Sequence, residues 1–341
     1  MHTSFTPTSR SGRLAYYVDH RDPHAAARAE RLLPHLPDDT TLLLNAPALL
    51  GRFPSWSGRV IDLSDAARTQ TADEARLLDW VSRGQPSVLL CDALFEGPTL
   101  QDRLPRMVRL RRPGFEDEER LQRQYGNAAM TLALAPHWFE SRQTPEWLRR
   151  KTQYVGCLPH PNCAEVERRA ARRTCGFEDD QRYVVVLKSG AHDSFSLTRV
   201  AAAAAHCPTH QWVRLGPVAH TDAALPGNLQ QVGMVPDADT YLRAADVVVS
   251  DAEVGLLHRV ASCCTPLVCL PDPDARHAQH TYAHALRRRG LALTFDRFPA
   301  PYQWPGILRR ADKLNALGWK HFYADNPSDR VAAFLRTIAR A

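Results

Sequence analysis

The sequence predicts an α/β protein with two domains, each built on a parallel β-sheet. The chain has 341 residues, about twice the usual domain size, which favours two domains of roughly 150 residues. Short apolar segments of strand length alternate with amphipathic helical segments through both halves, as they do where helices cover a parallel sheet. A stretch rich in Pro and aromatic residues, 136–162, lacks clear periodicity and is the expected connection between the domains.

The first half contains five strand-like segments and three helical ones. Each strand-like segment is a short, mostly apolar run bounded by polar or turn residues. These segments span 13–18, 41–45, 88–91, 106–110 and 129–135. The helical segments, in which apolar residues recur every three or four positions, span 25–33, 72–83 and 116–125. We expect a first domain at 1–150.

A second series of elements begins with the segment RYVVVLKSG, residues 182–190. Four further strand-like segments follow, each separated from the next by a helical or loop stretch. They span 210–216, 228–233, 245–251 and 266–271. We expect a second domain at 151–325.

The last residues, 326–341, have the pattern of an amphipathic helix. Asn326 or Ser328 supplies the capping signal. The apolar residues at helical spacing are Val331, Phe334, Leu335 and Ile338. One expected arrangement has this helix packed back toward the first domain.

Composition excludes several classes of protein. Hydrophobic residues are 44% of the chain and charged residues 23%, near globular averages, so disorder, collagen and coiled coil are excluded as the main state. The longest apolar runs, such as 267–270, are far shorter than the roughly 18–20 residues that span a bilayer. The polar N-terminus does not have the pattern of a signal peptide. The expected location is the cytoplasm, with peripheral association at the inner face of the membrane as a variant.

The cationic residues are almost all Arg. The net charge is +6, and Lys occurs only at positions 151, 188, 313 and 320, which leaves 39 of the 43 cations as scattered Arg. Nucleic acid is therefore a weak interpretation, and a phosphorylated small molecule or an anionic membrane fits equally well. The eight Cys include no CxxC pair, so neither a disulfide framework nor a zinc site is expected.

The strongest local signal is a tight loop between the strand at 182–190 and the helical stretch after it. Such a loop directs backbone N–H groups and the positive end of the helix dipole at one point, which suits a phosphate group. An ordinary strand-to-helix turn with a Ser or Asp cap is the alternative. The candidate donor-binding residues in the loop are Ser189, Gly190, Ala191 and Ser194.

A longer succession of segments follows between residues 233 and 286. It runs GMVPD, ADVVVS, DAEVG, LLHRVASCC, TPLVCLP and DARHAQHTYAHAL. This order resembles the donor-sugar half of GT-B glycosyltransferases, and most of all the bacterial family that includes the lipid-II-forming N-acetylglucosaminyltransferase. The resemblance covers about residues 182–335, and a looser one covers the first half.

The resemblance implies a GT-B fold, in which two Rossmann-like domains with parallel sheets face each other across a cleft, and a nucleotide-sugar donor on the second domain. Glu253 stands where relatives commonly have Gly, and Arg259 stands where they carry a Glu that binds the ribose. In the last loop of the motif only His280 matches the family pattern. The donor-binding residues that the resemblance indicates in this region are Ser250, Glu253, Gly255, Arg259 and His280.

In the first domain the resemblance places a Gly-rich loop ending in His after the first strand, but this chain has DHRDPH and no Gly. His24 is the nearest counterpart of the family His and is the candidate general base, unless it only opens a helix. His20 is the backup and a candidate for acceptor binding. Asp92, as a catalytic residue, and Glu96, as an acceptor-binding residue, follow the strand at 88–91, where they would orient an acceptor hydroxyl or serve as turn carboxylates.

These observations predict metal-independent, inverting transfer of a sugar from a nucleotide sugar to a sugar or lipid-linked acceptor, in cell-envelope or glycoconjugate biosynthesis. The DAD and DPD sequences at 237–239 and 272–274 lie in loops where the relatives bind no metal, so no metal and no cofactor are expected. The alternatives are a non-catalytic GT-B-like binding protein and a hydrolase or epimerase of nucleotide sugars with the same fold.

Overall fold

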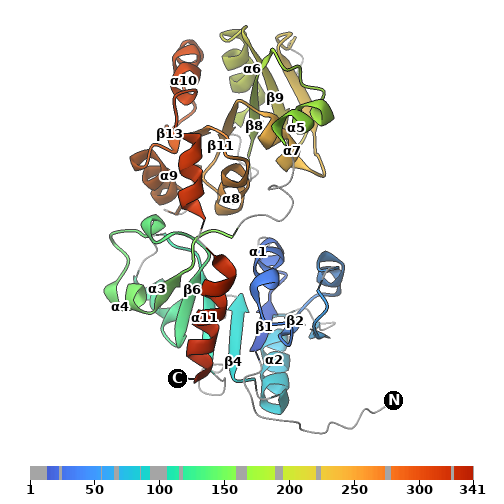
Figure 1. Cartoon of the computed structure of the whole chain (residues 1–341), viewed down its shortest axis with the longest axis vertical. Helices are drawn as coiled ribbons and strands as arrows, with labels where there is room; N and C mark the ends of the chain where they lie inside the picture. Colours follow the sequence, from blue (N-terminus) through green and yellow to red (C-terminus); the bar gives the residue numbers. More distant parts are fainter. Residues whose placement is uncertain are drawn as a thin grey trace.

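The computed structural model contains two parallel sheets, one of seven strands and one of six (Figure 1). It describes residues 14–22, 25–54, 56–64, 69–84, 86–92, 106–114, 118–158, 167–188, 195–219, 224–272, 278–323 and 326–340. All the strand pairs within both sheets are parallel. The predicted α/β class with two parallel sheets is confirmed.

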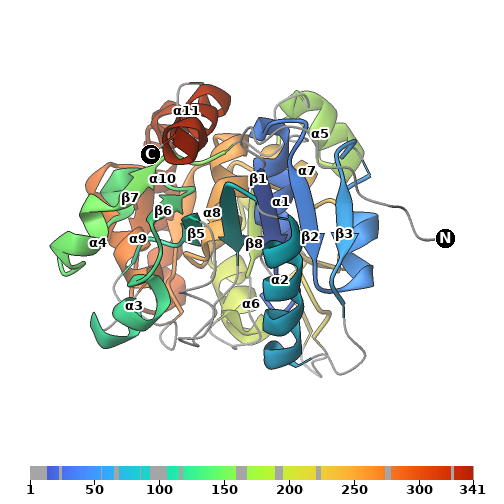
Figure 2. The same cartoon turned by 90° about the horizontal axis from the view of Figure 1, so that it is seen from below.

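The first sheet has the order β3-β2-β1-β4-β5-β6-β7, which runs across the view in Figure 2. The strands are β1 (Leu14–Val18), β2 (Thr41–Leu44), β3 (Val60–Asp62), β4 (Val88–Asp92), β5 (Arg106–Arg111), β6 (Met130–Ala133) and β7 (Thr152–Tyr154). Two edge strands, β3 and β7, were not expected, because each has three residues and little apolar signal. The strand order reverses between β1 and β4.

Alternate residues of β1 supply two different cores. Tyr16 and Val18 point into a core on one face, and Ala15 and Tyr17 point into the core on the other face. The first core is covered by α1 (Ala25–Leu32), and the second is covered by α2 (Gln70–Gly84). Such burial of both faces explains why the central strands β1, β2 and β4 are nearly continuous apolar runs. The remaining helical segments of this region are η1 (Leu33–His35), η2 (Pro47–Arg52), α3 (Glu118–Tyr125), η4 (His137–Phe139) and α4 (Glu146–Arg150).

The second sheet has the order β10-β9-β8-β11-β12-β13 and reverses between β8 and β11. Its strands are β8 (Arg182–Leu187), β9 (His210–Leu215), β10 (Leu229–Gly233), β11 (Val247–Ser250), β12 (Leu267–Cys269) and β13 (Ala292–Thr294). Helices α5 (Arg168–Cys175), α7 (Ala238–Ala244), α8 (Val254–Cys263), α9 (Ala278–Arg288) and η7 (Ala316–Phe322) lie on one face. Helices α6 (Leu197–Ala205) and α10 (Trp304–Ala311) lie on the other face, and η6 (Pro301–Gln303) leads into α10.

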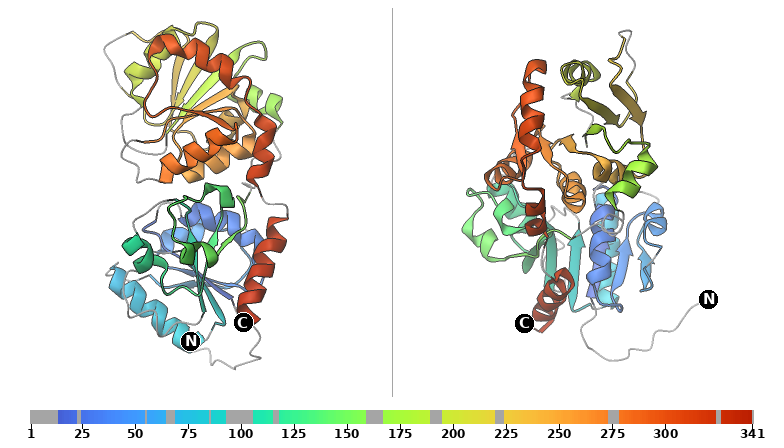
Figure 3. Two further views of the ribbon diagram at one scale, coloured as in Figure 1. Left: turned by 90° about the vertical axis from the view of Figure 1, so that its left-hand side faces the viewer. Right: turned by 45° about the horizontal axis from the view of Figure 1, so that its top comes forward.

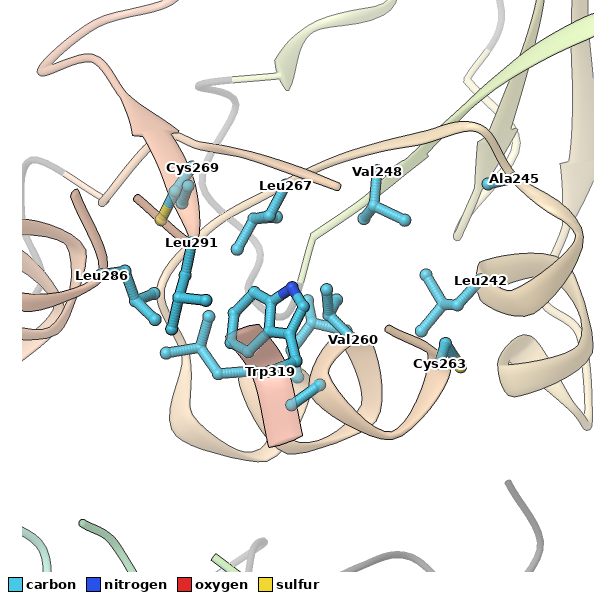
Figure 4. Close-up of a cluster of buried hydrophobic side chains, with 14 of the residues drawn as sticks. Leu242, Ala245, Val248, Val260, Cys263, Leu267, Cys269, Leu286, Leu291 and Trp319 are labelled. Carbon is cyan, nitrogen blue, oxygen red and sulfur yellow. The ribbon is translucent and has the colours of Figure 1, made fainter. Parts of the chain in front are cut away.

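Trp319 lies in the core between the second sheet and its helices (Figure 4). Its ring is fully buried among Val248 and Leu267 of the sheet, Val260 of α8 and Leu286 of α9. A buried Trp contributes a large apolar contact area, so Trp319 stabilises the packing of η7 against α8 and α9. None of the described helices has the length and apolar character needed to span a bilayer.

The last helix, α11 (Pro327–Arg340), returns to the first sheet (Figure 3). Its apolar residues Phe334 and Leu335 belong to the same core as β1 and α1. The guanidinium of Arg106 in β5 donates a hydrogen bond of 2.9 Å to the Ile338 carbonyl. The chain therefore crosses between the two domains twice, and the two crossings lie side by side where the Cys157 amide donates to the Phe322 carbonyl, 3.1 Å away.

The docking of α11 generates a stability prediction. Leu335 is 5% exposed, and we expect Leu335→Ala to lower the free energy of unfolding by about 2–5 kcal/mol, because the substitution leaves a cavity in the core of the first domain. Arg336→Ala, at an exposed position of the same helix, should change it by less than about 0.5 kcal/mol. Chemical denaturation measures both values, and equal effects of the two substitutions would contradict the docking of α11.

Candidate functional site

The carboxyl ends of strands from both sheets approach the boundary between the domains. In a sheet whose strand order reverses, ligands bind outside the carboxyl ends of the strands on either side of the reversal. The segment after β5 touches the start of α9, because a Cβ added to Gly114 would lie 2.9 Å from the Cβ of Ala278. The Tyr282 hydroxyl of α9 also donates a hydrogen bond to the Pro113 carbonyl. The residues that follow the strands of the two domains therefore meet, and they form the candidate site.

Buried side chains, rather than glycines, fix the loop after β1. The Asp19 carboxylate accepts hydrogen bonds from Arg21 Nε at 2.8 Å and Nη2 at 2.7 Å, and from Asn45 Nδ2 at 2.9 Å. Asn45 also donates to Asp73 of α2 at 2.9 Å and accepts from the His20 amide at 2.8 Å. The His20 side chain is 31% exposed, and its Nδ1 lies 3.9 Å from the Asp19 carboxylate. The described part of this loop, residues 19–22, is thus held by side-chain contacts rather than shaped by the backbone freedom of Gly.

Asp92, the last residue of β4, is held by Arg28 of α1. Arg28 Nε lies 2.9 Å from Asp92 Oδ2, and Nη2 lies 2.6 Å from Oδ1. The same Nη2 donates to Asp22 at 2.5 Å, and Arg112 donates to that carboxylate as well. Burial raises the pKa of Asp92, and the Arg28 guanidinium opposes that rise. Both carboxylate oxygens of Asp92 therefore accept hydrogen bonds from the Arg28 guanidinium.

In the second domain, charged and polar side chains gather on either side of the reversal between β8 and β11. Lys188 follows β8, and its Nζ lies 3.3 Å from the Asp272 carboxylate that follows β12, with both side chains only 10% exposed. Ser250 ends β11, and its enclosed hydroxyl has no hydrogen-bond partner among the residues that the structure describes. A buried hydroxyl without a partner costs about 1–3 kcal/mol, so the Ser250 hydroxyl is free to bond with a group from outside the described residues.

The N-terminus of α8 is capped by its own chain. The Glu253 carboxylate accepts a hydrogen bond of 3.0 Å from the Leu256 amide. Gly255 leaves space for this arrangement, because a Cβ there would lie 2.8 Å from Glu253 Oε2. The positive end of the α8 dipole is therefore already matched by a carboxylate. Arg259, one turn further along the helix, is ion-paired with the buried Asp239 of α7.

The structure brings some of the predicted site residues together and separates others. His20 and Asp92 lie at the carboxyl edge of the first sheet, and Ser250, Glu253 and Gly255 lie at that of the second. Arg259 is turned toward α7, and His280 lies half-buried in the first turn of α9. The remaining predicted residues lie outside the described part of the chain: His24, Glu96, Ser189, Gly190, Ala191 and Ser194.

Sequence reasoning missed two buried arginines of α1 and a buried lysine. Arg28 is 8% exposed and Arg31 is 5% exposed. Both follow Ala25 at helical spacing, on the face that carries Ala29 and Leu32. Arginine on the apolar face of a short helix was the available signal, since a buried charge needs a partner. Lys188 could have been found as a cation that directly follows a buried apolar strand.

The acidic pair at 237–239 is used within the fold. Asp237 caps α7 by accepting a hydrogen bond of 3.0 Å from the Asp239 amide, and the Asp239 carboxylate binds Arg259. Within the described ranges, no group of three or more His, Cys, Asp or Glu side chains is arranged to hold a metal ion.

Solved glycosyltransferases have the same architecture. The spinosyn forosaminyltransferase SpnP is similar over 96% of this chain and 99% of its own, with 13% identity and a TM-score of 0.67. The spinosyn rhamnosyltransferase SpnG covers 96% and 100%, with 16% identity and a TM-score of 0.63. MurG of Acinetobacter baumannii also covers 96% and 100%, with 12% identity and a TM-score of 0.63.

Other structures of SpnG contain thymidine diphosphate and the spinosyn aglycone. No protein-family model and no curated protein matches the sequence. The likeness to solved structures extends over both domains, and at these identities it shows the fold. The chain therefore has the two-domain GT-B fold that glycosyltransferases such as SpnP, SpnG and MurG possess.

Proposed function

We propose that this protein is a glycosyltransferase that moves a sugar from a nucleotide-sugar donor to a hydroxyl group of an acceptor. The observation that carries the proposal is the meeting of two polar strand edges at the domain boundary, in a fold matched over nearly its whole length by glycosyltransferases. Solved structures of SpnG contain thymidine diphosphate and an aglycone. In this chain the corresponding ligands, a nucleotide and an acceptor, would bind at the two edges, one on each domain.

The donor is assigned to the second domain. Ser250 offers an unpartnered hydroxyl at the strand reversal, where nucleotides bind in doubly wound sheets. Lys188 follows Leu187, which pairs with Ser250 in the sheet, and its ammonium group suits a phosphorylated ligand. The predicted loop residues Ser189, Gly190, Ala191 and Ser194 follow directly and are assigned to the phosphate groups.

The acceptor is assigned to the first domain. His24 is the proposed general base that removes the proton of the acceptor hydroxyl as this group attacks the anomeric carbon, with His20 as the backup. Asp92 is a positioning residue, because it holds Arg28 toward the loop that contains Asp22. Glu96 remains a proposed acceptor contact. A single displacement of this kind inverts the configuration of the sugar and uses no metal.

The proposed location is the cytoplasm, where nucleotide sugars are the donors. A sugar or a lipid-linked sugar is the proposed acceptor, and a lipid-linked one would bring the protein to the inner face of the membrane. The proposed process is glycoconjugate or cell-envelope biosynthesis.

One observation favours a second candidate function, a binding protein without catalytic activity. Glu253 places a carboxylate at the α8 N-terminus, and Arg259 is turned toward Asp239, so two positions that the resemblance assigns to the donor are occupied within the fold. Saturable binding of a nucleotide sugar without turnover would favour this candidate over the transferase.

Donor binding generates the first test of the proposal. A nucleoside diphosphate present at 100 times its dissociation constant should stabilise the native protein by about 2.7 kcal/mol. Thermal unfolding of the purified protein with UDP, dTDP, GDP and CMP, and with their sugars, identifies the base. If none of these ligands raises the unfolding temperature of a folded sample, the donor assignment is wrong.

The base assignment generates a second test. His24→Ala should lower kcat by about 10²–10⁴-fold, because a positioned general base contributes that much, while the dissociation constant of the nucleotide stays unchanged. The exposed His206→Ala is the matched control and should keep full activity, as should the wild-type enzyme in EDTA. Release of nucleoside diphosphate in the presence of acceptors measures turnover, and full activity of His24→Ala would move the role to His20.

A further inference from the structure

Arg31 is a buried cation that has no hydrogen-bond or ion-pair partner among the described residues. Its side chain lies at the end of α1 and the residue is 5% exposed. No described side chain or carbonyl accepts a hydrogen bond from it, and its Nε is fully enclosed. Burial lowers its pKa, yet a guanidinium stays protonated in proteins. A buried positive charge that the described chain leaves unpaired costs folding free energy, so a ligand that neutralises it would be bound strongly.

The surroundings of Arg31 belong to both domains. Its charge interacts with the thiol of Cys157 and the hydroxyl of Tyr323, on the two crossings between the domains, and with the carboxylate of Glu253 at the start of α8. Arg28, one turn earlier in α1, faces it with a like charge that opposes its protonated form. Arg31 and Glu253 form no ion pair, and the Glu253 carboxylate is directed to the Leu256 amide. The Arg31 guanidinium therefore interacts electrostatically with the carboxylate at the α8 N-terminus but forms no ion pair with it.

We propose that Arg31 binds the diphosphate group of the donor across the domain boundary. This inference rests on the proposed function and adds a cation from the first domain to the loop residues already assigned to the phosphates. A free helix N-terminus attracts phosphate through its amides and dipole, but in this chain Glu253 occupies the start of α8 with a negative charge. A guanidinium supplied by the other domain replaces that attraction, because it binds phosphate oxygens through two parallel hydrogen bonds. Binding of the donor then pairs the buried charge and links α1 to the second domain.

The test compares two substitutions, each of which removes one charge and which should change the dissociation constant of the diphosphate in opposite directions. Arg31→Met removes the guanidinium and should raise the dissociation constants of UDP, dTDP or GDP, whichever binds, and of inorganic pyrophosphate by about 10- to 100-fold. Glu253→Gln keeps an acceptor for the Leu256 amide but removes the negative charge, so the same constants should fall several-fold. Titration calorimetry measures both, and the exposed Arg287→Met is the matched control that should leave them unchanged.

Two further readouts distinguish binding from a structural role. Without ligand, Arg31→Met should unfold at the same or a higher temperature than the wild type, because a buried unpaired charge has been replaced by an apolar side chain of similar length. The corresponding nucleoside, which lacks the diphosphate, should bind the wild type and Arg31→Met equally.

Failure of the inference is separable from failure of the proposed function. If the wild type binds a nucleoside diphosphate and Arg31→Met binds it as tightly, the role of Arg31 is overturned and the donor assignment stands. If Arg31→Met weakens binding of the nucleoside and of the nucleoside diphosphate by the same factor, Arg31 has a structural role. In that case too the proposed role of Arg31 is overturned and the donor assignment stands. If the folded wild type binds none of these ligands, both proposals are overturned.

Discussion

Parallel strand pairing is the constraint on which the rest of this structure depends. In each sheet the strands run in one direction, so every segment that follows a strand emerges at the same edge. Asp19 follows β1 and Asp92 ends the neighbouring β4, and in the second sheet Ser250 ends β11 while Asp272 follows the neighbouring β12. Because the two edges approach each other at Pro113 and Tyr282, residues from most of the chain converge on one boundary.

At the edge of the first sheet, ion pairs and hydrogen bonds, rather than glycines, determine the conformation of the loop after β1. A Gly-rich loop gains its conformation from backbone freedom, whereas the loop after β1 gains it from the contacts of Asp19 with Arg21 and Asn45. Arg28 then joins Asp92 and Asp22, so that α1 is fixed to β4 through a buried ion pair. Removing one partner of such a pair leaves the other charge buried and unpaired, so a single substitution in this network is strongly destabilising.

The sequence predicted the elements that are buried on both faces and missed three of the four strands that lie at a sheet edge. The segments containing Tyr16, Leu43 and Val185 are continuous apolar runs because helices cover both sides of their strands. The strands β3, β7 and β13 have three residues each and contain polar ones, whereas the equally short β12 is wholly apolar and was recognised. Arg31 could not be assigned from the sequence, because its surroundings come from Cys157, Glu253 and Tyr323, and only the folded chain brings those segments together.

The return of α11 makes the second domain an insertion within the first. The core that contains β1 is completed only by Val331, Phe334, Leu335 and Ile338, near the end of the chain. During translation the first domain must therefore wait for the whole second domain to be synthesised, roughly ten to forty seconds at the usual rates. Until then the apolar surface that α11 covers is open to other proteins, so this segment is where a nascent chain would need a chaperone most.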